Sequence, residues 1–595
     1  MSLLKLWLES KDLLDVRSFQ VHEAMSSPFE VTIIAVSADE DIDLEAMLAR
    51  EAIFFLGGPS PRHRFWKGLV SHVQEVQAEK PLPGMPALST YLVRVVPRLW
   101  MLTQRRGNRI FQHKSVPEIV EAILTEHGVD FINRVTDAHR QQEYRVQYGE
   151  SDFAFVSRLL EEAGIGTFFE PLWQENADFG EGASTDYRSV LVLSDNPQSR
   201  IKRETIPYVD NPNQGPGLDF VSHVKLSHET LPGRFTIRDY DFKKPDYPLF
   251  GQSTQAPLPE EFLEQYRYEH GAFKSDAAGD RRAAVALSGV RRKKRNLTYS
   301  SNCFDLYPGI VFSVDSHPRK DLAPEHTLLV LDAVLEGTVN GEWSLTGEAA
   351  FTDVPYRPPQ RTPLPRIGGV QSAVVVGPKD EEIYTDEHGR IKVQFHWDRE
   401  GQKDEQSSCW VRVSQGWAGG AYGMMALPRV GQEVIVTFWE GNPDQPLVVG
   451  RLYNVKNQPP YKLPDDKTKS TWRSSTYPGG EGHNELTFDD RKGSELVYVR
   501  AERDMRQWIK HDRHTLIGEV DTTLVGTQSL VAVLPPGKKG KSTTFMEMFD
   551  RRINITSGMA MVLLDGDSVT ITGLTVNILG LAEVNIAGGK VRLNC

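Results

Sequence analysis

The most informative stretch of this sequence is its last part, residues 553–595, which reads INITSGMAMVLLDGDSVTITGLTVNILGLAEVNIAGGKVRLNC. Glycines recur in it every seven or eight residues, at Gly558, Gly566, Gly573, Gly580 and Gly588. Between them lie apolar pairs two residues apart: Ile553/Ile555, Met561/Leu563, Val569/Ile571, Val576/Ile578, Val584/Ile586 and Val591/Leu593. A spacing of two places each pair on one face of a strand, and glycine tolerates a tight corner before the next strand. The stretch therefore predicts very short strands that turn at regular intervals.

Strands this short cannot bury their apolar face alone, so neighbouring strands must stack on them, as in a β-helix. We prefer a β-helix because the turns recur without a two-residue hairpin signature such as Asn-Gly. A plain antiparallel meander is the alternative. A single thread would leave two open edges and a narrow apolar stripe, which is an aggregation hazard. Three copies wound together would pair every edge and turn each stripe inward. The sequence thus predicts an obligate, stiff homotrimer whose needle core and corners are the pairs and glycines above.

The composition of the whole chain excludes several protein classes. Its 595 residues suggest about four domains. The net charge is −12, whereas proteins that bind nucleic acids usually carry a basic surplus, so no nucleic-acid partner is expected. Three distant cysteines give neither a disulfide framework nor a paired-cysteine zinc site. We find no secretory signal peptide and no apolar run of transmembrane length, so export would need a dedicated machine.

The first 365 residues predict β-barrels around a small insert. Short apolar runs between glycine and proline turns are typical of a β-barrel. One helix is expected after Ser115, which has capping-box spacing, and another between Ser151 and Gly164. A proline-rich linker closes this part. The expected divisions are a first β-barrel at 1–105, an α/β insert at 106–185 and a second β-barrel at 186–365.

Residues 366–455 predict a five-stranded barrel of the OB type, because five short apolar runs alternate with Gly, Pro, Asn and Asp breaks. The expected strands are Ala373–Val376, Ile391–Trp397, Trp410–Val413, Glu433–Trp439 and Leu447–Tyr453. A connector is expected at 456–500 and the needle at 501–595, with a possible excursion at 527–550 where the repeat is interrupted.

Several long motifs resemble a known family. They are CWVRVSQGWAGGAYGMMALPRVGQEV (409–434), FWEGNPDQP (438–446), GRLYN (450–454), GEGHNELTFDDRKGSELVY (480–498) and ESDFAFVSRLLEEAGI (150–165). They are similar to VgrG, the valine-glycine-repeat spike family of type VI secretion systems, which is itself similar to contractile-phage hub and spike proteins. The resemblance covers essentially the full chain. It implies a mainly β fold with phage-hub-like β-barrel domains, a small α/β insert, an OB-fold barrel and a C-terminal intertwined trimeric β-helix.

The resemblance also implies a function. The chain would be a homotrimeric puncturing spike at the tip of a secretion tube, assembled in the cytoplasm and secreted through the type VI apparatus without a signal peptide. Its hub would match hexameric Hcp tube rings, and its needle end, at Leu593 and Cys595, would receive a PAAR-repeat tip protein. Effector or adaptor proteins would travel with it, and the target membrane would be contacted mechanically. The alternatives are the hub of a phage tail or extracellular contractile injection device and, in another class, an effector enzyme acting on peptidoglycan or nucleotides.

Motifs that suggest chemistry have simpler explanations. Residues 530–543 resemble a phosphate loop, but Pro535 stands where the loop needs a glycine amide. His511 and His514 are loosely spaced for zinc. The basic run Arg291–Arg295 fits a solvated loop or an intersubunit contact better than a nucleic-acid site. The sequence therefore predicts no enzyme activity, no cofactor and no metal. It leaves open the cargo, the target cell, an axial ion and the role of Cys595.

Overall fold

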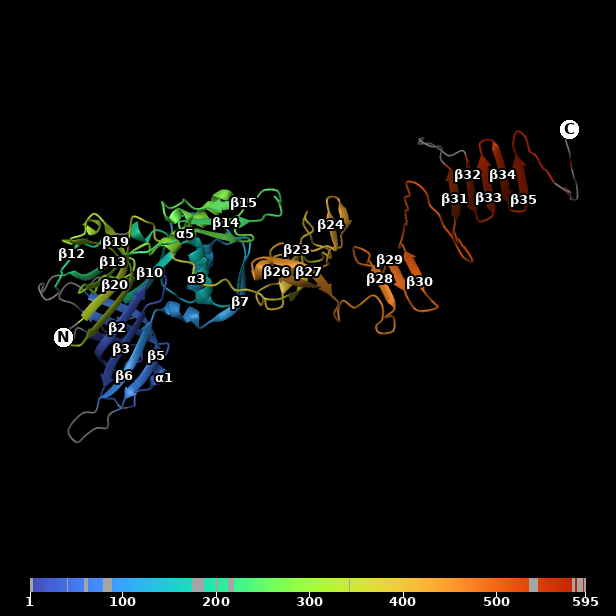
Figure 1. Ribbon diagram of the computed structural model, residues 1–595. Coiled ribbons are helices and arrows are strands. Elements are labelled where there is room, and N and C mark those ends of the chain that lie inside the picture. The colour runs from blue at the N-terminus through green and yellow to red at the C-terminus, as the bar shows by residue number, and fades with distance from the viewer. Residues whose placement is uncertain are drawn as a thin grey trace. The chain divides into compact units, whose positions relative to one another are not determined.

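The computed structural model describes residues 4–592, apart from 40, 58–62, 79–87, 174–186, 200–201, 212–218, 342, 534–543, 581–583 and 586–591. The chain folds into two compact units, Met1–Arg500 and Ala501–Cys595, whose elements are labelled in Figure 1. No helix in the described part of the chain is long and apolar enough to cross a membrane.

A sheet of twelve strands dominates the first unit. Its strand order is β1-β4-β5-β6-β3-β2-β19-β20-β17-β13, with β18 beside β19 and the short β12 beside β18. The strands are β1 (Leu4–Leu8), β2 (Asp15–Ala24), β3 (Glu30–Ser37), β4 (Glu51–Gly57), β5 (His63–Gln77), β6 (Ser89–Val96), β12 (Ile206–Pro207), β13 (Val221–His228), β17 (Arg295–Ser301), β18 (Val311–Asp315), β19 (Thr327–Thr338) and β20 (Trp343–Phe351). Burial alternates along β3, as expected for a strand with one face on a core.

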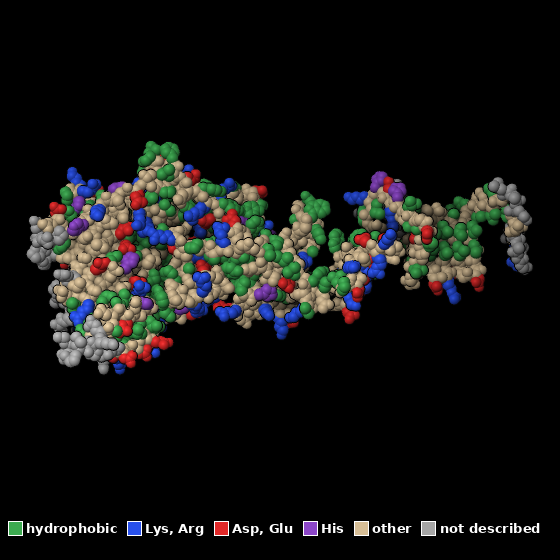
Figure 2. Space-filling view, turned by 60° about the horizontal axis from the view of Figure 1, so that its bottom comes forward, with side chains coloured by type: hydrophobic (Ala, Val, Ile, Leu, Met, Phe, Trp, Pro, Cys, Tyr) green, Lys and Arg blue, Asp and Glu red, His purple; other side chains and the backbone are tan. Residues whose placement is uncertain are grey.

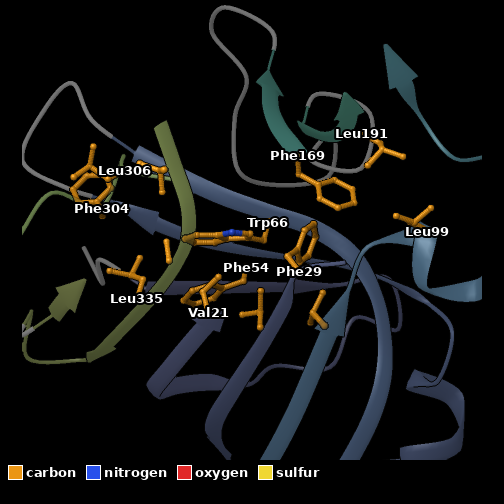
Figure 3. Packing of buried hydrophobic residues seen from close by; sticks show 14 of the residues in the cluster. Val21, Phe29, Phe54, Trp66, Leu99, Phe169, Leu191, Phe304, Leu306 and Leu335 are labelled. Carbon is orange, nitrogen blue, oxygen red and sulfur yellow. The ribbon is translucent and has the colours of Figure 1, made fainter. Parts of the chain in front are cut away.

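The pairing of β2 with β19 joins the first and third predicted segments in one sheet. They also share a core with the insert. Figure 3 shows Val21 and Trp66 of the N-terminal strands beside Leu335 of β19, and Phe29 of the turn before β3 packs edge-on at 5.0 Å against Phe169 of the insert. The three predicted segments therefore share one large hydrophobic core, beside smaller clusters such as that of Phe235 and Leu249.

The two predicted helices of the insert are confirmed. Ser115 caps α2 (Val116–Glu126) in a capping box with Glu118, and Ser151 caps α3 (Asp152–Ala163). Gly164 ends α3 at a φ of 74°, a conformation that favours glycine. The insert also contains two small sheets, β7-β9 and β10-β11-β8. Their strands are β7 (Arg106–Phe111), β8 (Phe131–Arg134), β9 (Arg145–Ser151), β10 (Gly166–Trp173) and β11 (Tyr187–Ser194).

A third long helix, α5 (Asp276–Arg291), lies where the sequence predicts only strands. Its buried face consists of small residues such as Ala283 and Gly279, so the sequence carries no strong apolar stripe. The small residues allow close packing, since a Cβ on Gly279 would lie 2.7 Å from the Phe273 ring. The helix packs on the sheet β15-β14-β16, whose strands are β14 (Arg234–Asp239), β15 (Leu249–Gln252) and β16 (Glu264–Tyr268). The shorter helices are α1 (Leu44–Met47), η1 (Arg98–Thr103), η2 (Pro197–Ser199), η4 (Glu260–Phe262), η5 (Lys320–Leu322) and η6 (Trp439–Gly441).

The predicted five-stranded barrel follows, with strand order β22-β21-β26-β27-β23. Backbone hydrogen bonds of 2.8 and 2.9 Å between Ile391 and Val411 close the last strand onto the first. Val375, Phe395 and Val436 fill its interior. The strands are β21 (Gln371–Val376), β22 (Lys392–Phe395), β23 (Arg412–Val413), β26 (Glu433–Phe438) and β27 (Pro446–Leu452). A separate hairpin, β24 (Trp417–Gly419) with β25 (Tyr422–Met424), projects from the barrel (Figure 1).

The first unit ends in an antiparallel sheet of β28 (Lys469–Arg473), β29 (Glu485–Asp489) and β30 (Leu496–Arg500). The second unit contains a sheet in which each strand pairs with the next. Its strands are β31 (Gln528–Val533), β32 (Thr544–Phe549), β33 (Arg552–Ser557), β34 (Ala560–Asp565) and β35 (Ser568–Thr572). Within one chain this is the antiparallel meander that the sequence left as the alternative.

The absence of Asn-Gly did not exclude hairpins in this unit. Gly558 and Gly566 hold the first position of two-residue loops, with φ of 59° and 55°. A glycine at this position also makes a tight hairpin turn that matches the twist of the strands.

Candidate functional site

In the sheet β28–β30, one face is apolar and exposed, and on the other face the middle strand β29 carries the buried polar residues Glu485 and Thr487. Strand β30 is exposed on both faces. The register places six residues on the exposed face: Trp472, Leu486, Val499, Ser470, Phe488 and Val497. Trp472 is 71% exposed and Val497 is 64% exposed, whereas Glu485 on the opposite face is 6% exposed. This reverses the usual distribution of a water-soluble sheet, so the apolar face is a surface that needs a partner.

Glu485 is the centre of the buried polar face. The hydroxyls of Thr487 and Thr471 donate hydrogen bonds to its carboxylate at 2.6 and 3.2 Å, and the Tyr461 hydroxyl donates a third. The Nε2 atom of His483 lies 3.2 Å from the same carboxylate. Burial raises the pKa of Glu485, but the hydroxyl hydrogen bonds outweigh burial and hold this pKa at about 2. The Glu485 carboxylate is therefore charged, and it is held by hydrogen bonds on the face of the sheet opposite Trp472.

The meander of the second unit also gathers apolar side chains on one face, as Figure 2 shows in part. The cross-strand pairs place together Val531, Met546, Met548, Ile553, Ile555, Val562, Leu564, Val569 and Ile571. Val569 is 65% exposed and Ile571 is 52% exposed. No described residue of this unit is buried. Such a sheet has no core of its own within one chain, and its apolar face needs a cover.

The structure separates the predicted needle pairs between the two faces. Ile553, Ile555, Val569 and Ile571 share the apolar face, but Met561 and Leu563 lie on the other. The reason is that β34 carries four consecutive apolar residues, and its register turns Val562 and Leu564 toward the Ile553 side.

The remaining predicted needle residues lie outside the strands or outside the described residues. Val576, Ile578 and Val584 are exposed, Gly573 directly follows β35, and Gly580 belongs to no regular element. Outside the described residues lie Ile586, Gly588, Val591, Leu593 and Cys595, together with 534–543 of the predicted excursion.

A buried charge cluster fixes the barrel to the insert. Asp444 accepts a hydrogen bond of 2.7 Å from the amide of Val146 and one of 2.9 Å from the Arg145 guanidinium. Arg145 also binds Glu162 at 2.9 Å, and Arg282 lies 3.6 Å from the same carboxylate. Burial raises the pKa of Glu162, but the two guanidinium groups outweigh burial and hold this pKa at about 2. Every charge here faces an opposite one, so the junction is closed within the chain.

The basic run and His511 make contacts within the chain, whereas most of the motif that resembles a phosphate loop, residues 534–543, lies outside the described residues. In the basic run, Arg291 lies 2.8 Å from Glu260 and Arg295 lies 2.7 Å from Asp353, so these cations serve pairs within the chain. His511 is exposed and lies 2.7 Å from Asp512. The described residues contain no group of three or more His, Cys, Asp or Glu side chains that could hold a metal ion.

The sequence analysis did not predict the role of two features, the Asp444 cluster and the exposed apolar face of the sheet β28–β30. Asp444 lies in the Gly-Asn-Pro-Asp-Gln-Pro turn, and nothing in that motif indicates a contact with Arg145. The reversed sheet did carry a signal, because Trp472, Leu486 and Phe488 alternate with polar residues in their strands. Alternation reveals two faces but does not tell which face is buried.

Three family models match the sequence. The phage tail baseplate hub (GPD) model matches residues 22–341, and the type VI secretion system/phage-baseplate injector OB domain matches residues 371–453. The bacteriophage T4 gp5 C-terminal trimerisation domain matches residues 470–537, which include the reversed sheet. The expectation of a mainly β chain with an OB-fold domain and a trimerisation domain is confirmed.

Solved structures with this fold include the E. coli c3393 protein, described as a type VI secretion component with structural similarity to T4 bacteriophage tail proteins gp27 and gp5. It has a TM-score of 0.54 and 23% identity over 75% of this chain and 100% of its own. A chain of the half-lidded Francisella PdpA-VgrG complex has a TM-score of 0.50 and 8% identity over 84% of this chain and 87% of its own. Both show the fold.

Curated relatives in Pseudomonas aeruginosa are named type VI secretion system spike proteins. VgrG4b is 37% identical over 85% of this chain, which spans 62% of the length of VgrG4b. VgrG1a is 31% identical over 98% of this chain and 93% of its own length. By sequence and by domain order, the chain belongs to the VgrG family of type VI secretion system spike proteins.

Proposed function

We propose that this chain is a non-enzymatic, homotrimeric puncturing spike carried at the tip of a type VI secretion tube. The observation that supports it best is the reversed sheet β28–β30, whose exposed Trp472 and Val497 lie within the match to a trimerisation domain. Within one chain, Glu485 and its hydroxyl partners occupy the opposite face of the sheet. The apolar face is therefore free to contact another copy of the chain.

The work of such a spike is mechanical. Three chains would join their apolar faces and pair their free strand edges, which gives a stiff shaft with hydrogen bonds along its length. The hub would transmit the push of the tube, and the closed Asp444 junction would keep the barrel from tilting on it. Each chain carries −12, so neighbouring trimers repel one another and stay soluble.

Each domain of the chain has its own role in this proposal. We assign the hub to 1–365, with its parts at 1–105, 106–185 and 186–365, the OB barrel to 366–455, the connector to 456–500 and the needle to 501–595. The hub would seat on hexameric Hcp rings, and the needle end would take a PAAR-repeat protein. A Francisella VgrG forms a complex with PdpA, which supports effector or adaptor partners for this chain as well. Assembly in the cytoplasm and export through the apparatus complete the proposal.

The oligomeric state tests the proposal directly. The mass of the purified full chain, measured by mass photometry, is expected to equal three chains of 67.0 kDa. A variant without residues 553–595 is expected to form trimers that are weaker or absent. A full chain that stays monomeric at every concentration would refute the spike, and so would enzyme turnover abolished by a single substitution.

A further inference from the structure

The hairpin β24–β25 of the barrel has an unusual surface. Residues 413–428 contain no charged side chain, although a quarter of the whole chain is charged. Every residue from 416 to 426 is exposed. Surface loops of soluble proteins normally carry charge and do not display large apolar groups together.

Four large side chains at this hairpin are exposed to a large extent. Trp417 is 65% exposed, Tyr422 64%, Met424 45% and Met425 81%. The Trp417 and Tyr422 rings pack edge to face, at a centroid distance of 5.8 Å, and the Tyr422 ring lies over Gly419 of the same hairpin. In the space-filling view, hydrophobic side chains form the tip of the projection from the barrel (Figure 2). Trp, Tyr and Met are enriched where proteins contact each other.

The hairpin is held in one shape before any partner arrives. Its strands pair Trp417 with Met424 and Gly419 with Tyr422. Gly423 has a φ of 138°, and a Cβ there would lie 2.4 Å from the Trp417 carbonyl oxygen. At the base, the Gln415 side chain accepts a hydrogen bond of 3.1 Å from the amide of Ala426. A rigid aromatic hairpin loses little conformational entropy on binding, which favours a contact surface over a mobile loop.

We infer that this hairpin is a second contact between copies of the chain: the hairpins of three protomers meet one another around their common axis, apart from the needle. The inference rests on the proposed trimer and adds a place where its subunits touch. Side chains that lie next to a threefold axis meet their own counterparts from the other two chains, so any charge there would meet a like charge. An uncharged hairpin removes that repulsion, whereas a different protein partner would give no reason to exclude charge of both signs.

The hairpin is also continuous with the surface proposed to trimerise. Arg451 of β27 donates a hydrogen bond to the carbonyl of Ala426, which ties the hairpin to the strand that leads toward β28. Beyond Arg451, Tyr453 is 65% exposed and Val455 is 88% exposed. Exposed apolar side chains thus occur between the hairpin and Trp472 of the reversed sheet, at Tyr453 and Val455.

Photocrosslinking tests the contact in the full chain. The probe p-benzoylphenylalanine replaces Trp417, and copies with two different tags are co-expressed, purified and irradiated. We expect covalent species that carry both tags. The matched control places the probe at Gln402, an exposed residue in a charged turn of the same barrel, and is expected to give none. A protein that is trimeric by mass but shows no crosslink between copies from position 417 overturns the hairpin contact alone. A monomeric protein overturns the proposed function as well.

Charge variants distinguish a self-contact from a contact with another partner. Met425→Glu and Met425→Lys should each raise the Kd of the trimer by about tenfold, because like charges meet in both cases. Co-expression of the two variants should restore mixed trimers toward wild-type stability. Thermal unfolding of the barrel should not change, since Met425 is exposed. Opposite effects of the two charges, or no effect of either, would overturn the inference.

Discussion

Phe54 and Phe488 are both strand phenylalanines in one chain, but their surroundings differ completely. Phe54 is fully buried in the hub, between Phe19 at 4.9 Å and Trp66 at 5.7 Å. Phe488 is 44% exposed on the reversed sheet. The polar contacts differ from the apolar face in the same way. Asp444 finds its partners, Arg145 and Val146, within the chain, whereas the apolar face of the reversed sheet has no cover from the described residues. The comparison teaches that the hub and barrel have cores of their own, whereas the described part of the second unit buries no residue within one chain.

The largest expected effects come from the same substitution in both regions. Phe54→Ala should lower the free energy of unfolding of the chain by about 3–5 kcal/mol, because it opens a cavity in the hub core. Phe488→Ala should leave that quantity nearly unchanged and instead weaken the trimer by about 1 kcal/mol per subunit, because Phe488 is 44% exposed and only this part of it remains to be buried. Denaturant unfolding and dilution followed by mass photometry measure the two quantities.

The control for Phe488 is Asp490→Ala in the exposed turn after β29, which should change neither quantity. If Phe488→Ala destabilised the isolated chain as strongly as Phe54→Ala does, the open face would be covered from within, and the comparison would fail.

The next effect concerns the junction. Asp444→Ala leaves Arg145 buried with one carboxylate fewer, and we expect a loss of about 3 kcal/mol in the free energy of unfolding. The trimer contacts of the shaft should survive. Glu387→Ala is the control, because that side chain is 80% exposed. A neutral Asp444→Ala would show that the barrel does not depend on this cluster for its position on the hub.

Local rules predicted much of this molecule, and tertiary contacts decided the rest. Ser115, Ser151 and Gly164 mark helix ends by interactions within a few residues, so the insert helices could be placed from sequence. The sequence did not predict helix α5, because its buried face consists mainly of alanine and glycine. Such a face packs by close approach to its neighbours and shows no apolar stripe in the sequence.

At the candidate site, the strands and the glycine turns were predictable, but the partners of the strands were not. Val562 and Leu564, not Met561 and Leu563, lie beside Ile553 and Ile555, because β34 is apolar at four consecutive positions and either register looks equivalent in the sequence. Long-range pairing and the choice of the buried face are properties of the assembled sheet.

A smaller effect should appear in acid. The pKa of Glu485 is about 2 in the folded chain, below its ordinary value of 4.5, so its hydrogen bonds stabilise the fold above about pH 4.5 and lose this effect as the pH falls toward 2. Glu485→Gln should therefore cost about 2 kcal/mol at pH 7 and progressively less in acid. Unfolding of both proteins between pH 7 and pH 2.5 gives the comparison. A difference that does not depend on pH would mean that the carboxylate charge contributes nothing to the polar face.

The smallest effect distinguishes the two arrangements of the second unit. In a meander, Gly558 and Gly566 need a positive φ and Gly573 does not, so alanine should cost about 1 kcal/mol at each of the first two positions and almost nothing at the third. Gly573 is a fair control because a Cβ there would meet its nearest atom at an ordinary 3.5 Å. In an intertwined β-helix with regular corners, the three costs should be equal. Thermal unfolding of the three full-length variants measures them, and equal costs would show that the trimer turns these hairpins into corners.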